Sequence, residues 1–268
     1  MKFLRYPGGK RKLISFLSYY LPNAYEIEGR YIEPFVGGGS IFFFIQPLSA
    51  LLSDLNKELI ELYKGIRNSP HKVWEIFQEF PEGRKNYYMI RDQDLKDKSL
   101  SYRAARVLYL NRTCFKGMWR HNAYGNFNVG YGGEDRRWVI THESIKEVSQ
   151  ILRNAKIEQA DFESVLDCVD DNDFLFLDPP YKPGEANLVE SHYFNGVFSF
   201  TEQVRLANKL KEITKKKKIK WLMTNSSHPN IRELYADFHV SDVPKGTSGI
   251  IGVFTNDAKE IVISNYLS

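Results

Sequence analysis

The chain has 268 residues, a formal net charge of +4 and 43% hydrophobic residues. This length allows one large domain or two small ones with a real core, and the composition is typical of a soluble globular protein rather than a disordered or fibrous one. The mildly positive charge permits a nucleic-acid partner without requiring one.

Targeting signals and metal motifs are missing from the sequence. The longest apolar run is far too short to span a membrane, and the first residues lack the apolar segment of a secretory signal. The two cysteines and six histidines do not have the spacing of metal ligands or of a disulfide framework. We therefore expect a cytoplasmic protein without a membrane partner and without a bound metal.

The first predicted feature is a glycine turn that leads into a short basic helix. Gly8 and Gly9 precede Lys10, and apolar residues at helical spacing follow until Pro22. Backbone N–H groups at such a helix start can hold an anion, and Lys10 would add a positive charge. The spacing is not that of a nucleotide P-loop, and a simple turn before a solvated helix explains the same residues equally well.

A strand, a glycine turn and a second strand that ends in an acid come next. The strand at Tyr31 is followed by glycines at 37–39, and the strand at 50–53 ends at Asp54. Glycines let the backbone approach a ligand closely, and an acid at the end of the second strand can bind ribose hydroxyls. The unit predicts a site for an adenosine-containing cofactor, although three adjacent glycines are not the fingerprint of NAD enzymes.

Residues 57–113 change in character, because apolar residues recur at helical spacing and strand signals are absent. They predict a helical insertion in the sheet.

In the loop-rich stretch that follows, basic, amide and aromatic residues alternate. Arg and Asn side chains can read bases and Lys usually meets phosphate, so we interpret this stretch as a DNA contact. The alternative is an irregular surface loop whose basic side chains lie along apolar surface.

The sheet pattern resumes with a helix at 143–153 and a strand at 156–159, which lead to Asp161 and Phe162. An acid and a ring at a strand end could hold an adenine by its amine and its face. The alternative, a helix N-cap followed by a packed ring, explains these two residues at least as well.

The next strand, Phe174–Leu177, is apolar throughout and ends in Asp178, two prolines and Tyr181. Ligands of open α/β sheets bind outside the carboxyl ends of strands, and prolines make such a turn stiff. The Asp178 carboxylate and the Pro179 carbonyl could accept both N–H bonds of an exocyclic amine, while Tyr181 stacks on its ring. The alternative is a proline-rich turn that only caps a buried strand.

The remaining elements complete an α/β sheet. We expect helices at 201–214 and 230–236, and strands at 221–224, 238–243 and 260–266.

In their order along the chain, these motifs resemble the Dam-type, class-alpha (D12 family) adenine-N6 DNA methyltransferases. The matching set is Tyr6-Pro7-Gly8-Gly9-Lys10, Glu33-Pro34-Phe35-Val36-Gly37-Gly38-Gly39-Ser40, Asp54, Arg120 with Asn122, Phe127-Asn128-Val129, and Asp178-Pro179-Pro180-Tyr181. The resemblance covers nearly the whole chain. It implies a Rossmann-like methyltransferase sheet formed by residues 1–56 and 141–268, with a helical target-recognition insertion at 57–140.

The resemblance also implies functional residues. Those expected to bind S-adenosylmethionine are Tyr6, Lys10, Phe35, Gly37, Asp54, Asp161, Phe162 and Asp178. Those expected to hold a flipped target adenine of double-stranded DNA are Asp178, Pro179 and Tyr181. The predicted DNA contacts are Arg112, Lys116, Arg120, Asn122 and Asn126, with Arg120 in the major groove. Of these, Arg112 and Lys116 follow from composition and position rather than from the family.

Two departures from the family pattern concern the target sequence and the cofactor. Tyr6 stands where Dam proteins usually carry Trp, and Gly130 where they commonly have Pro. An aromatic ring is retained at the first position. The second, together with the segments around Met118-Trp119 and Ser248-Gly249-Ile250-Ile251, which do not follow the Dam pattern closely, leaves the recognition sequence open, with GATC as one candidate. The resemblance is compatible with a monomer, encoded by a bacterium or a phage, that acts apart from a cognate restriction endonuclease.

Rival functions remain at this point. One is methylation of RNA adenine or of a protein amide, although such enzymes often carry Asn in place of Asp178. Another is a catalytically dead methyltransferase fold that only binds DNA, against which the intact motifs argue. A dehydrogenase has no use for the proline turn.

Overall fold

The computed structural model describes residues 3–6, 8–122, 125–181, 191–193, 196–244 and 260–267. Their main feature is a seven-stranded sheet of order β3-β2-β1-β4-β7-β9-β8. The strands are β1 (Tyr31–Glu33), β2 (Ala50–Asp54), β3 (Ala155–Gln159), β4 (Phe174–Leu177), β7 (Lys220–Ser226), β8 (His239–Asp242) and β9 (Glu260–Ser264). The first five are parallel, and β9 is antiparallel to both neighbours. A separate hairpin pairs β5 (Ser191–Tyr193) with β6 (Gly196–Phe198).

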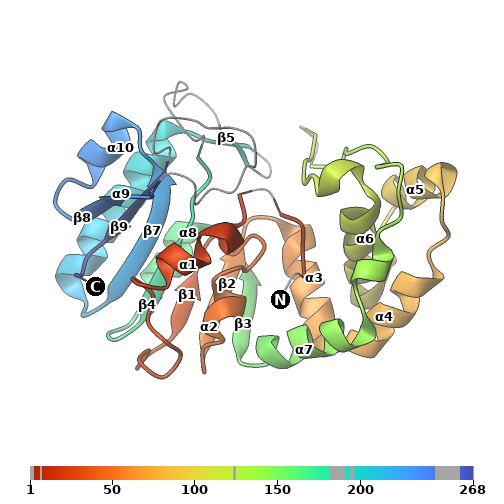
Figure 1. Ribbon diagram of the computed structural model, residues 1–268, viewed down its shortest axis with the longest axis horizontal. Helices are drawn as coiled ribbons and strands as arrows, with labels where there is room; N and C mark the ends of the chain where they lie inside the picture. Colours follow the sequence, from red (N-terminus) through yellow and green to blue (C-terminus); the bar gives the residue numbers. More distant parts are fainter. Residues whose placement is uncertain are drawn as a thin grey trace.

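Helices cover both faces of the sheet (Figure 1). Successive side chains of a strand point to opposite faces, so Phe174 and Phe176 enter one hydrophobic core while Leu175 and Leu177 enter the other. The first core also contains residues of α1 (Ile14–Leu17), α2 (Phe42–Ile45), α3 (Lys57–Asn68) and α7 (His142–Leu152). The second contains residues of α8 (Phe162–Asp167), α9 (Phe200–Lys216) and α10 (Pro229–Leu234). The predicted α/β class is confirmed.

The stretch predicted as an insertion is helical, as expected. Helices α4 (Pro70–Glu79), α5 (Arg84–Arg91) and α6 (Leu100–Thr113) lie together at the right of Figure 1. They reach the sheet through α3 and α7, and α3 packs against both α6 and the strands β2 and β3. One continuous core contains residues of the sheet and of all these helices. The insertion therefore shares its hydrophobic core with the sheet.

The strand order places the candidate site. The chain turns away from β1 toward β2 on one side, whereas β4 lies on its other side. In doubly wound folds, ligands bind at the carboxyl ends of the strands where the order reverses in this way. Since β1 and β4 are parallel neighbours, the turn that begins at Pro34 and the turn that begins at Asp178 lie at the same edge of the sheet.

The first predicted helix is shorter than expected. A 3₁₀ turn, η1 (Lys10–Leu13), leads into a single α-helical turn, α1, and the chain leaves helical structure before Tyr20. No side chain caps either element, so tertiary packing of Leu13 and Leu17 in the core, rather than local capping, holds this segment.

The contact between α3 and α6 depends on a glycine. A Cβ built on Gly65 would lie 2.4 Å from the Cβ of Ala104. We predict that Gly65→Ala lowers the free energy of unfolding by about 1–3 kcal/mol, because overpacking outweighs the better helix propensity of alanine. Urea denaturation followed by circular dichroism measures this loss. Adding Ala104→Gly should restore part of it, and a Gly65→Ala protein as stable as wild type would contradict the prediction.

Candidate active site

The glycine turn after β1 is held from two sides. Gly37 has a φ of +45°, in the left-handed region that favours glycine. Its N–H donates to Asp54 Oδ2 at 3.0 Å, and its carbonyl accepts a hydrogen bond of 2.7 Å from the hydroxyl of Tyr63 on α3. Asp54 is 1% exposed, and its Oδ1 accepts the N–H of Asn56 at 2.9 Å. The predicted cofactor turn is thus fixed by the acid at the end of β2.

Aromatic rings surround this turn. A Cβ on Gly37 would lie 3.1 Å from Cε1 of Tyr6, which shows that the Tyr6 ring lies directly on the glycine backbone. Burial, with the negative charge of Asp54, raises the pKa of Tyr6 well above its ordinary value, so its hydroxyl stays neutral. Phe35 packs against Phe162 with ring centres 5.5 Å apart. The structure therefore brings the predicted residues Tyr6, Gly37 and Asp54 together, and joins Phe35 to Phe162.

Asp161 is a helix cap in this structure. Its Oδ1 accepts the N–H of Glu163 at the start of α8, and its carboxylate pairs with Arg205 of α9 at 2.9 Å. The guanidinium carbon of Arg205 lies 4.2 Å from the ring centre of Phe162. The helix-cap interpretation is confirmed, and an adenine-binding role for Asp161 and Phe162 stays a prediction. Nothing in the sequence motifs pointed to Arg205.

The carboxylate of Asp178 is held through one oxygen. Its Oδ1 lies 2.8 Å from Nζ of Lys10 and accepts a 2.7 Å hydrogen bond from the hydroxyl of Thr224 on β7. Within the described part of the chain, the hydrogen bond and the ion pair of Asp178 both go to Oδ1 and none goes to Oδ2. One oxygen is therefore fixed by protein donors, and the other keeps its capacity to accept a bond from a ligand.

Lys10 connects the N-terminal turn to this acid. Its ammonium donates to the carbonyl of Gly8 at 3.0 Å and lies 5.0 Å from the ring centre of Tyr181. Its side chain is buried. In the structure Lys10 pairs with Asp178 and lies over the ring predicted to stack on the target base, and its contact with a cofactor carboxylate stays a prediction.

Polar residues of β7 and α9 support the proline turn. Gln203 donates its side-chain amide to the carbonyl of Pro180 at 3.2 Å and accepts a 3.0 Å bond from Asn225. Gln203, Thr224 and Asn225 are all buried. None of the three was predicted from the sequence. The one available signal, for Thr224 and Asn225, was the polar run Thr224 to Ser226 that follows the apolar residues of β7.

The predicted DNA contacts fall into two groups. Arg112 is 1% exposed at the end of α6 and donates to the carbonyl of Phe3, and burial lowers its pKa to about 10. The prediction that Arg112 contacts DNA is therefore wrong, because this side chain anchors the N-terminal segment in the core. The other four predicted contacts are exposed: Lys116, Arg120, Asn122 and Asn126.

Three of these exposed residues lie on one short hairpin, whose arms pair at His121 and Phe127. Arg120 donates to the side chain of Asn128 at 2.9 Å. The N–H of Asn122 donates to the Asn126 carbonyl, and the Asn122 side chain accepts the N–H of Asn126. Their exposure suits contact with a large ligand, and their role in binding DNA stays a prediction.

Glu33, at the carboxyl end of β1, is a buried acid beside the site. Burial raises its pKa well above the ordinary value of 4.5, and the negative charges of Asp178 and Asp54 act in the same direction. A 2.7 Å hydrogen bond from the hydroxyl of Tyr31 opposes the shift without cancelling it. Folding therefore favours the protonated form of Glu33.

Comparisons with known proteins agree with one another. A family model described as D12 class N6 adenine-specific DNA methyltransferase matches residues 6–247. The chain is 33% identical over 273 residues to the type II methyltransferase M1.LlaDCHI of Lactococcus lactis subsp. cremoris, a match that covers 98% of this chain and 95% of the relative. It is 29% identical over 241 residues to the DNA adenine methylase of Vibrio cholerae, covering 87% and 84% of the two chains. It is 34% identical to the DNA N-6-adenine-methyltransferase of Escherichia phage P1, over 87% of this chain and 31% of the phage protein.

Helix length and hydropathy give one further finding. Across the part of the chain that the structure describes, no helix is both long and apolar enough to cross a membrane.

Glu33 yields a prediction about pH. Since its pKa is higher in the folded than in the unfolded chain, its contribution to stability is fully present below about pH 4.5 and is lost as the pH rises through the folded pKa. We predict that Glu33→Gln gains stability relative to wild type as the pH rises from 5 to 8, by at most about 1.4 kcal/mol per pH unit. Urea denaturation across this range measures the difference. The exposed Glu28→Gln is the control, and parallel curves for Glu33→Gln and wild type would contradict the prediction.

Proposed function

Because the chain belongs to the D12 class of N6 adenine-specific DNA methyltransferases, we propose that it transfers the methyl group of S-adenosylmethionine to N6 of an adenine flipped out of double-stranded DNA. The observation that carries this proposal is the Asp178 carboxylate, held by Lys10 and Thr224 through Oδ1. It lies at the same sheet edge as the glycine turn. We assign residues 57–140 to DNA recognition, and residues 1–56 and 141–268 to cofactor binding and catalysis.

The residues of the glycine turn suit S-adenosylmethionine. The two oxygens of Asp54 accept the backbone N–H groups of Gly37 and Asn56. As an acid at the end of the second strand, Asp54 would accept the ribose hydroxyls. Tyr6 and Phe35 would pack against the cofactor beside Gly37, and Asp161 with Phe162 would hold its adenine. When bound, the cofactor supplies an electrophilic methyl group on a positively charged sulfur.

The proline turn suits the exocyclic amine of adenine. The nitrogen is a poor nucleophile because its lone pair is delocalised into the ring. Asp178 Oδ2 and the Pro179 carbonyl would accept its two N–H bonds, which localises the lone pair and stabilises the developing positive charge. Tyr181 would stack on the flipped base, and these contacts offset the cost of flipping, a few kcal/mol. Positioning of the nitrogen in line with the methyl group supplies much of the remaining rate.

The rival functions receive less support. The family and the relatives named above concern DNA rather than RNA or protein amides. The contacts of Lys10, Thr224 and Gln203 around the proline turn favour an active enzyme over a binding module on a dead fold. The type II name of one relative favours a restriction-modification role beside a separate endonuclease. We further propose that the enzyme acts as a monomer in the cytoplasm of a bacterial or phage-infected cell.

The direct test is transfer of labelled methyl groups from S-adenosylmethionine to genomic DNA that lacks adenine methylation, followed by modified-base sequencing. N6-methyladenine confined to one short motif supports the proposal and gives the recognition sequence, for which GATC is the first candidate to check. Incorporation into RNA or protein controls but not into DNA would overturn it.

Asp178 itself is the first residue to vary. We predict that Asp178→Ala abolishes methyl transfer, because the amine loses its fixed acceptor, while the circular dichroism spectrum stays that of the wild type. Asp97→Ala, which removes an exposed carboxylate, is the matched control and should transfer normally. Near-normal turnover by Asp178→Ala would refute the assigned mechanism.

Thr224 acts as a positioning residue in this proposal. We predict that Thr224→Val lowers kcat about 10- to 100-fold, since a hydrogen bond to a charged group contributes about 1.5–3 kcal/mol. KM for DNA should change little. Thr224→Ser keeps the hydroxyl and should retain most of the activity. Steady-state kinetics of the wild type, Thr224→Val and Thr224→Ser measure these effects. Equal kcat values for Thr224→Val and the wild type would exclude this role.

A further inference from the structure

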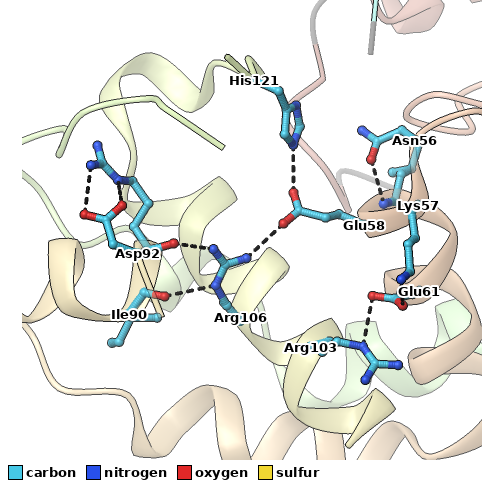
Figure 2. A network of polar contacts seen from close by, with 11 residues as sticks. Asn56, Lys57, Glu58, Glu61, Ile90, Asp92, Arg103, Arg106 and His121 are labelled. Carbon is cyan, nitrogen blue, oxygen red and sulfur yellow. Dashed lines mark hydrogen bonds and ion pairs between the residues drawn. The ribbon is translucent and has the colours of Figure 1, made fainter. Parts of the chain in front are cut away.

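Glu58, in the first turn of α3, contacts His121 (Figure 2). His121 lies on the hairpin that also carries Arg120 and Asn122. Its Oε2 lies 2.8 Å from Nε2 of His121, and its Oε1 accepts a 3.0 Å bond from Arg106 of α6. The Glu58 side chain is 18% exposed and the His121 side chain 4%. The hairpin is therefore joined to α3, the helix that follows β2, by a contact to a carboxylate that is largely shielded from solvent.

Arg106 fixes the position of Glu58 in turn. Its guanidinium also donates to the carbonyl oxygen of Ile90 at 2.9 Å (Figure 2), and to the carbonyl oxygen of Arg91. Burial alone would raise the pKa of Glu58, but the bond with His121 and the charge of Arg106 hold it below the ordinary value. The carboxylate of Glu58 therefore stays charged between His121 and Arg106.

Alternation along the hairpin strand separates anchoring from exposed side chains. Trp119 packs on Tyr6 with ring centres 5.6 Å apart, and His121 binds Glu58. Residues two apart in an extended strand share a face, and the residues between them face the other way. Arg120 and Asn122, which follow Trp119 and His121, are accordingly exposed.

We propose that Glu58 is a positioning residue for DNA recognition, which acts through His121 to present Arg120 and Asn122 at a fixed place relative to the methyl-transfer site. This inference rests on the proposed function, because it takes the hairpin to be the element that reads DNA. Glu58 touches neither substrate nor cofactor in this scheme. Its effect should therefore fall on DNA affinity and on discrimination between sequences rather than on the chemical step.

Glu61 provides a matched control on the same helix. It pairs with Arg103 of α6 at 3.0 Å and is 14% exposed, close to the value for Glu58 (Figure 2). The two acids thus make similar ion pairs between α3 and α6. Glu61 also pairs with the exposed Lys57 on its own helix at 3.8 Å, whereas Glu58 also binds a hairpin residue. A purely structural role therefore predicts similar effects for both.

The experiment compares Glu58→Gln, Glu61→Gln and Arg120→Ala, with kcat and KM measured on a duplex that contains the recognition site and on duplexes with one base changed. We expect Glu58→Gln to raise KM for the site, or to reduce discrimination, by about tenfold or more, which corresponds to the loss of one charge-assisted bond. Its kcat and its cofactor affinity should stay within about twofold of wild type, as should every parameter of Glu61→Gln.

A double-mutant cycle tests whether Glu58 acts through His121. His121→Ala should reproduce the effect on DNA, and Glu58→Gln should add little in its presence. Should Glu58→Gln fail to fold, His121→Ala removes the same contact from the hairpin side and makes the same prediction. Equal effects of Glu58→Gln and Glu61→Gln, or independent addition in the cycle, would overturn the inference. If Arg120→Ala leaves both KM and discrimination unchanged while wild type methylates DNA, the DNA-reading role of the hairpin fails, and this inference fails with it.

Discussion

The carboxylate of Asp54 joins three parts of the molecule at one point. It accepts the N–H of Gly37 in the turn after β1 and the N–H of Asn56 at the start of α3, and it is itself the last residue of β2. Asn56 then caps α3 by accepting the N–H of Leu59. The shape of the glycine turn and the starting direction of α3 are therefore set by the same buried side chain, so this turn and the helices that begin with α3 are placed together.

The proline turn receives its support from elements that are distant in sequence. Lys10 comes from the N-terminal segment, Thr224 from β7, and Gln203 from α9. The acid and the carbonyls that follow β4 are thus fixed relative to the two cores on the opposite faces of the sheet. Fixed acceptors of this kind stabilise developing charge without reorganisation during the reaction, which is the physical basis of the mechanism that we assign to this edge.

Local patterns predicted the fold well wherever burial repeats along the chain. The apolar run Phe174–Leu177 is a strand with those bounds. The segment after residue 57, where apolar residues recur at helical spacing, forms helices α3 to α6. The burial of Arg112 was not predicted because α6 is buried along its whole second half. Its sequence there does not separate a polar, exposed face from an apolar, buried one, so nothing marks this arginine as buried. The contacts of Lys10 and Thr224 with Asp178 depend on how distant segments are arranged around the sheet, which local sequence does not encode. The family motifs identified Lys10 but did not indicate that it pairs with Asp178.

The continuous core beneath the insertion bears on how new target specificities can arise in this fold. Exchange of residues 57–140 as a block would cut through packing shared with the sheet, including the close approach of Gly65 to Ala104. The hairpin offers a smaller unit of change, because its outward side chains alternate with the anchored Trp119 and His121. Under the DNA-reading role that we propose for the hairpin, its outward positions can diversify by single codon changes while both anchors persist, so new target sites can arise without rebuilding the sheet.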